Sequence, residues 1–122
     1  MTRRSAAAKR KSDKRVRDLV DRMVARIVRR FRPEKIILFG SQAHGTPTAD
    51  SDVDLLVLMP LPRGRLDKAG KEIAMRCAVR DIHIPKDILV ATPEEFERRR
   101  DIVGTIANEA ALGGNVLYDR HA

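Results

Sequence analysis

Several features that define other protein classes are scarce or absent in this sequence of 122 residues. It contains one cysteine, Cys77, which excludes an internal disulfide and a zinc site built from cysteines. No apolar run approaches the ~20 residues that a membrane-spanning helix needs. The first fifteen residues are charged but lack the apolar stretch of a secretory signal. These absences predict a cytoplasmic protein that makes no membrane contact.

Aromatic side chains are also scarce, at 3% of the residues and with no tryptophan, whereas apolar residues make up 43%. The core must therefore consist of Val, Ile, Leu, Ala and Met, and we expect Met23, Met59 and Met75 to pack within it. Few rings are available for base stacking, which disfavours binding to single-stranded nucleic acid. The length fits one small domain.

Acidic residues are scarce at the N-terminal end. Residues 1–35 contain fourteen Lys/Arg and four Asp/Glu, a net charge of +10, whereas residues 36–122 contain eleven and thirteen, a net charge of −2. We expect residues 1–12 to form a disordered basic arm and residues 13–122 to form the domain. A solvated charged face is the favoured interpretation of this basic region, ahead of an acidic protein partner and of nucleic acid.

Hydrophobic periodicity predicts two long helices. In the first, apolar residues from Val16 to Phe31 recur at helical spacing, so the helix should begin near Ser12 or Asp13 and end before Pro33. The second covers residues 66–80. The series that predicts it is Leu66, Ala69, Ile73, Cys77 and Val79 or Arg80, with Cys77 expected on the buried side.

Short apolar runs predict four strands, at residues 35–39, 52–59, 86–91 and 115–118. A further helix should start at Thr92-Pro93, break near Gly104, resume through Ile106 and stop at Gly113-Gly114. The order helix–strand–strand–helix–strand–helix–strand predicts an α/β fold of the mixed α+β kind. In this fold a short mixed sheet has helices packed against it.

The ends of the predicted strands carry glycine, serine and aspartate in a regular pattern. Gly40-Ser41 follows the first strand, and after ten intervening residues Asp52 and Asp54 open the second. Residues i and i+2 of a strand point to the same face, so these two carboxylates would lie together and repel each other. A hard cation such as Mg²⁺ would offset this repulsion.

Asp87 stands at the start of the next long strand. If the two strands are neighbours, three carboxylates converge, which is enough for two metal ions ~3.5–4 Å apart, the arrangement used in phosphoryl and nucleotidyl transfer. Gly40 lets a phosphate approach the backbone, and Ser41 adds a hydroxyl group beside free backbone N–H groups. The pattern therefore predicts a Mg²⁺-dependent site for a nucleoside triphosphate.

This pattern resembles the nucleotidyltransferase superfamily related to DNA polymerase beta, and in particular its minimal nucleotidyltransferase branch. The resemblance covers about residues 34–119, including PKDILVATPEEFE and the closing VLYD. It implies the nucleotidyltransferase fold, with Gly40, Ser41 and His44 as nucleotide-binding residues, His44 standing where many relatives have Arg. It also implies that Asp52, Asp54 and Asp87 are catalytic and hold two Mg²⁺ ions, and that AMP is transferred from ATP.

The resemblance extends to a biological role. Minimal nucleotidyltransferases resemble antitoxins that pair with HEPN-type RNase toxins. This implies transfer of AMP to a hydroxyl of the toxin, expected to be a Tyr hydroxyl, and assembly into a hetero-oligomer. Two alternatives stay open: a catalytically weak antitoxin that neutralises its toxin by occlusion, and an enzyme whose acceptor is RNA or a small molecule. The surfaces that could dock a partner are the N-terminal helix and Arg98-Arg99-Arg100.

Overall fold

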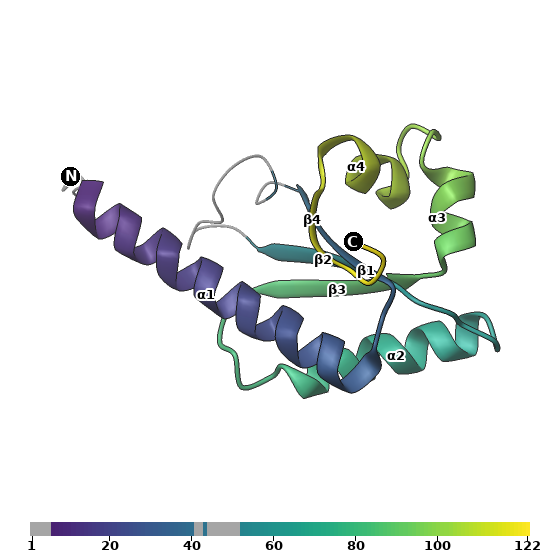
Figure 1. The fold of residues 1–122 in the computed structure, drawn as a ribbon, viewed down its shortest axis with the longest axis horizontal. Helices are drawn as coiled ribbons and strands as arrows, with labels where there is room; N and C mark the ends of the chain where they lie inside the picture. The colour runs from purple at the N-terminus through teal and green to yellow at the C-terminus, as the bar shows by residue number, and fades with distance from the viewer. Residues whose placement is uncertain (1–5, 41–42, 44–51) are drawn as a thin grey trace.

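One four-stranded mixed sheet, with helices on both of its faces, organises the chain (Figure 1). The computed structural model describes residues 6–40, 43 and 52–122, and within them the side chains from residue 13 onward. The elements, in chain order, are α1 (Ala6–Phe31), β1 (Lys35–Phe39), β2 (Val53–Leu58), α2 (Arg65–Ala78), β3 (Lys86–Ala91), α3 (Pro93–Arg99), α4 (Ile106–Gly113) and β4 (Asn115–Asp119).

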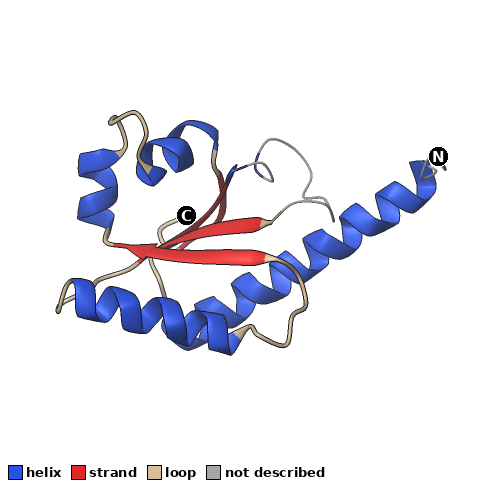
Figure 2. Ribbon diagram, turned by 180° about the vertical axis from the view of Figure 1, so that it is seen from behind, coloured by secondary structure: helices blue, strands red, loops and turns tan. Residues whose placement is uncertain are grey.

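The strand order across the sheet is β3-β2-β1-β4. β1 pairs antiparallel with both β2 and β4, whereas β2 and β3 are parallel. α1 and α2 cover one face, and α3 and α4 cover the other (Figures 1 and 2). The predicted mixed α/β fold with helices against a short sheet is thus confirmed.

The position of β2 between two cores explains why its sequence is an almost continuous apolar run. Val53, Leu55 and Val57 face the core under α1 and α2, while Leu56 and Leu58 belong to a second core under α3 and α4. An inner strand that is buried on both faces needs apolar residues at successive positions. Asp54 is the exception, a half-buried carboxylate in this apolar run. The packing of the two cores does not explain it.

α1 presents the predicted apolar face to the sheet, and its buried residues begin at Val16. The helix itself begins at Ala6, so the predicted start near Ser12 or Asp13 is wrong, and residues 6–12 are helical where an arm was expected. Alanine, lysine and arginine have high helix propensity, which lets the helix continue beyond the part that packs. Its first turns accordingly extend away from the sheet (Figures 1 and 2).

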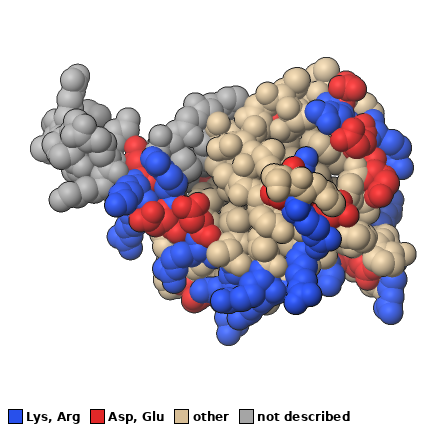
Figure 3. Space-filling model, viewed as in Figure 1, with Lys and Arg blue, Asp and Glu red and all other residues tan. Residues whose placement is uncertain are grey.

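The exposed side of α1 is mixed in charge. Figure 3 shows acidic side chains among the basic ones along α1, with Lys and Arg prevailing along the lower edge of the molecule. The exposed Asp18 and Asp21 lie among the exposed Lys14, Arg17 and Arg22. Because opposite charges alternate here, this surface fits a solvated helix face better than a nucleic-acid footprint.

α2 packs with a different face from the one its apolar residues predict. Leu66 is 69% exposed and Ile73 is 60% exposed, and Cys77 is exposed as well. Met75 and Ala78 are buried instead. The predicted buried face is therefore wrong along α2 itself, and Cys77 is not a core residue, although Val79, just after the helix, is buried. Met23, Met59 and Met75 are buried as expected.

The edge of the sheet explains this rotation of α2. β3 is an edge strand, and its outward backbone groups need partners. The Glu72 carboxylate accepts a hydrogen bond from Val90 N at 2.9 Å, and Arg76 Nη2 donates to Ile88 O at 3.4 Å. These bonds turn the polar side of α2 toward β3 and leave the apolar stripe in solvent.

The C-terminal helices follow their predicted signals. Thr92 caps α3 by accepting a hydrogen bond from Glu95 N at 3.0 Å, with Pro93 in the first turn. Thr105 caps α4 by accepting one from Asn108 N at 3.1 Å, directly after Gly104. No helix in the described part of the chain combines the length and apolar character needed to cross a membrane.

The packing of α2 can be tested with two truncations on the same helix. Met75→Ala should lower the free energy of unfolding by about 2–5 kcal/mol, because Met75 is fully buried. Ile73→Ala should change it by no more than about 0.5 kcal/mol, because Ile73 is mostly exposed. Urea denaturation measures both values. Equal losses for the two variants would contradict the orientation of α2.

Candidate functional site

The predicted aspartates lie at one end of the sheet. Asp54 is the register partner of Phe39 in β1 and of Asp87 in β3. Asp52 was expected to open this strand. It lies immediately before β2 instead, because β2 begins at Val53. Gly40 directly follows β1. The strand pairing thus places Gly40, Asp54 and Asp87 in a row across three neighbouring strands.

The alternation of side chains places Asp54 and Asp87 on the same face of the sheet. Leu56, two residues after Asp54, belongs to the core under α3 and α4, and Leu89, two residues after Asp87, packs against that core. Residues two apart in a strand point to the same side. The two carboxylates therefore face the side of the sheet that carries α3 and α4.

Asp54 has an unfavourable electrostatic environment for a carboxylate. Burial raises the pKa of Asp54 above 3.8, and the negative charges of Asp87, Asp52 and Glu109 raise it further. Glu109, in the first turn of α4, was not predicted as part of the site. No motif marks it, because its position depends on how α4 lies over the sheet. Like charges collected at a strand end favour binding of a cation.

Asp87 has a cationic neighbour. Arg76 Nη2 of α2 lies 3.2 Å from Asp87 Oδ1, and both side chains are about half exposed, at 48% and 52%. Arg76 was also missed at the sequence level, although its spacing of four residues from Glu72 puts both side chains on one side of α2. The structure thus pairs Asp87 with a guanidinium group.

Gly40 is required by both its backbone and its surroundings. Its φ is +77°, and a Cβ atom added there would lie 2.5 Å from Asp54 Oδ2. Any other residue would be strained and would displace the Asp54 carboxylate. The nucleotide-binding predictions for Ser41 and His44 fall outside the described residues.

The residues present fit a divalent cation in chemistry but are not gathered as a closed metal centre. Within the described residues, no three side chains of His, Cys, Asp or Glu form a group that could hold a metal ion. The strand pairing brings together two of the three expected carboxylates, Asp54 and Asp87, and the charge of Asp52 contributes to the raised pKa of Asp54. The convergence of all three on metal ions stays a prediction. Asp52, Asp54 and Asp87 supply hard oxygen ligands, and half-exposed Asp87 would have to exchange Arg76 for a cation.

The chain is similar to known proteins over most of its length. A family model described as a nucleotidyltransferase domain matches residues 20–113. The solved structure of a candidate nucleotidyltransferase from Sulfolobus solfataricus aligns with a TM-score of 0.61 and 19% identity, covering 99% of this chain and 94% of that one. At this identity the likeness shows the fold alone. No curated protein matches the sequence.

Two further solved structures align less well. One, described as a minimal nucleotidyltransferase, has a TM-score of 0.46 and 22% identity, covering 85% of this chain and 94% of that one. The other, a mutant of the MntA–HpeT toxin–antitoxin complex, has a TM-score of 0.49 and 16% identity, covering 82% and 72%. At these scores, neither likeness bears on the function of this chain.

Gly40→Ala tests the close approach between Gly40 and Asp54. The matched control is Gly64→Ala, because Gly64 also has positive φ, at 60°, but a Cβ atom there meets nothing within 4 Å. Both variants should lose about 1–3 kcal/mol of stability to backbone strain. If the site holds Mg²⁺ as the sequence predicts, Mg²⁺ should raise the Tm of the parent and of Gly64→Ala, and Gly40→Ala should lose that rise. An unchanged Mg²⁺ response in Gly40→Ala would contradict this account of the site.

The raised pKa of Asp54 predicts a pH dependence of stability. Between 3.8 and the folded-state pKa, the folded protein binds more protons than the unfolded chain, so stability falls as the pH rises through this window. Asp54→Asn cannot ionise at this position and should be more stable than the parent at pH 7. The difference should disappear as the pH falls toward 3.8.

Urea denaturation across this pH range, without divalent cations, measures the effect of Asp54→Asn. Asp101→Asn is the control, because Asp101 is exposed in the loop between α3 and α4. If Asp54→Asn is less stable than the parent at pH 7, burial and the neighbouring negative charges do not disfavour the Asp54 carboxylate as described.

Proposed function

This chain belongs to the nucleotidyltransferase domain family, and from that membership we propose that it transfers AMP from ATP to a hydroxyl group of a partner protein with Mg²⁺. The observation that carries this proposal is the row of Gly40, Asp54 and Asp87 across β1, β2 and β3. It combines a glycine that lies against the Asp54 carboxylate with carboxylates that repel one another without a cation.

Each residue of the row has its own role in the proposed reaction. Gly40, with Ser41 and His44, binds the phosphates of ATP. Asp52, Asp54 and Asp87 would hold two Mg²⁺ ions. When bound, these ions would neutralise the charge of the phosphates and the charge that develops during transfer. The acceptor oxygen forms a bond to the α-phosphorus, and the bond from that phosphorus to the oxygen bridging to the β-phosphate breaks, releasing pyrophosphate. Asp87 takes up the proton of the acceptor hydroxyl.

The order of strands supports a direction for this transfer. β1 and β3 lie on opposite sides of β2. With the departing pyrophosphate at Gly40 on the β1 side, in-line attack brings the acceptor from the β3 side, where Asp87 and α2 lie. An acceptor that approaches there meets the surface of α2.

The exposed side of α2 supports a protein as the acceptor. Leu66, Ile73 and Cys77 form an exposed apolar stripe, and Arg76 connects the same helix to Asp87. An apolar surface next to the reacting groups suits a protein contact. The flanking Arg65 and Arg80 are exposed, so the complementary partner face would be apolar with an acidic rim.

We propose that the partner is a HEPN-type RNase toxin, that a Tyr hydroxyl of the toxin accepts AMP, and that this chain is the antitoxin of a hetero-oligomeric pair. The motif resemblance described above supports this choice of partner. An antitoxin that acts by occlusion alone is the alternative within the same pairing. The alternative acceptors are RNA and a small molecule.

Transfer of label from α-³²P ATP with Mg²⁺ tests the proposal, using the purified protein with an extract of its host cells and then with the purified partner. We expect a labelled protein band. Asp54→Asn should weaken the label by more than the ~10–100-fold that loss of an outer-shell partner costs, because Asp54 is a proposed metal ligand. Asp101→Asn, an exposed carboxylate elsewhere, should label as the parent does.

Other outcomes select between the alternatives. Label in RNA or small molecules, with no protein band, would move the acceptor to another class. Neutralisation of the toxin by Asp54→Asn at the parent level, with no labelling by the parent, would establish occlusion and reject catalysis.

A further inference from the structure

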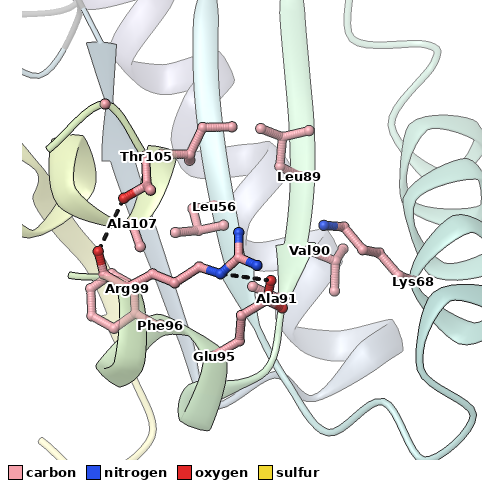
Figure 4. A pocket seen from close by; sticks show the side chains of 12 residues that line it. Leu56, Lys68, Leu89, Val90, Ala91, Glu95, Phe96, Arg99, Thr105 and Ala107 are labelled. Atoms are coloured by element: carbon pink, nitrogen blue, oxygen red, sulfur yellow. Dashed lines mark hydrogen bonds and ion pairs between the residues drawn. The ribbon is translucent and has the colours of Figure 1, made fainter. Parts of the chain in front are cut away.

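A pocket lies on the same face of the sheet as Asp54 and Asp87. The residues that line it have no role in the reaction proposed above. Its volume is about 360 Å³, and it is lined by β2, β3, α3, the start of α4 and one side chain of α2. Figure 4 shows Leu56 and Leu89 on its floor and Ala107 on the α4 side. Lys68 and Arg99 extend toward it from α2 and α3.

The pocket is continuous with the row of carboxylates. Leu56 and Leu89 are register partners, and each lies two residues after an aspartate of the row, on the same face. Two residues of a strand advance by roughly 6–7 Å. The floor of the pocket therefore begins about one ribose length from Asp54 and Asp87.

The residues that line the pocket disfavour a phosphate chain and suit a nucleobase. Its floor is apolar and offers a phosphate chain no hydrogen bond, and the Glu95 carboxylate beside it would repel one. The Arg99 guanidinium is oriented by Glu95, with Nε and Oε1 3.8 Å apart, and offers a flat surface on which a heteroaromatic ring can stack. Lys68 and Arg99 donate hydrogen bonds, and the Glu95 carboxylate accepts them, which matches the mixed edge of a purine.

We infer that this pocket binds the purine base of the nucleoside triphosphate whose α-phosphate lies at Asp54 and Asp87. The inference rests on the proposed nucleotidyl transfer. The base lies between the leucine floor and the Arg99 guanidinium, and Lys68 and Glu95 contact its edge. The ribose spans the short distance between the pocket and the carboxylates.

Binding measured by titration calorimetry with Mg²⁺ tests this inference separately from catalysis. The probes are ATP, GTP, CTP and inorganic tripolyphosphate, which has the phosphates but no base. Ala107→Phe fills the pocket and should weaken ATP binding about tenfold or more, while tripolyphosphate binding stays within about twofold. Unchanged tripolyphosphate binding also shows that this variant is folded.

Two more variants complete the design. Ala74→Phe places the same ring on an exposed position of α2 that does not line the pocket, and should bind every probe as the parent does. Arg99→Gln, at a side chain that is 55% exposed, should weaken the purine nucleotides several-fold more than CTP.

The inference is overturned if Ala107→Phe binds ATP as the parent does, if it weakens ATP and tripolyphosphate equally, or if the parent binds ATP no more tightly than tripolyphosphate. ATP binding that depends on the pocket, in a protein that transfers no label, would support the pocket and reject the proposed function. A parent that binds neither ATP nor GTP would overturn both.

Discussion

The parallel pairing of β2 with β3 is the constraint on which the rest of the structure depends. It places Asp54 opposite Asp87 and Leu56 opposite Leu89, so that one register sets both the carboxylate row and the apolar floor beside it. A slip of one residue would move every side chain of β3 to the other face. Ile88 and Val90, which are buried beneath α1 and α2, oppose such a slip. The hydrophobic core thus holds the polar residues in position.

The same edge strand accounts for the unusual exposure of α2. Glu72 and Arg76 satisfy backbone groups of β3 that would otherwise be open to pairing with another strand. The helix on that edge therefore has two sides with different roles. Its polar side completes the sheet, and its apolar side remains uncovered within the described chain. The apolar stripe of α2 would by itself face the sheet. The hydrogen bonds to the edge strand β3 turn the polar side of α2 there instead.

The sequence alone predicted the strands, the cap of α3, the break before α4 and the buried face of α1, because short-range signals determine each of these. It also singled out Gly40, Asp54 and Asp87, which the pairing of three adjacent strands brings together; their roles stay a prediction. It failed for α2, because which side of a helix is buried depends on what it packs against. It missed Glu109 and Arg76 for the same reason, since both come from helices whose placement over the sheet has no local signal. The start of α1 was misplaced because helix propensity continues beyond the packed residues.

The exposure of Cys77 has a practical consequence. The chain has one thiol, it lies on the surface, and it directly follows Arg76, the residue that contacts Asp87. A thiol-reactive fluorophore or spin label would therefore attach at a single known position without any engineered substitution. From there it would report on motion of the Arg76–Asp87 pair and on the approach of any molecule to α2. Cys77 thus provides a single attachment point for a spectroscopic label beside the proposed site of chemistry.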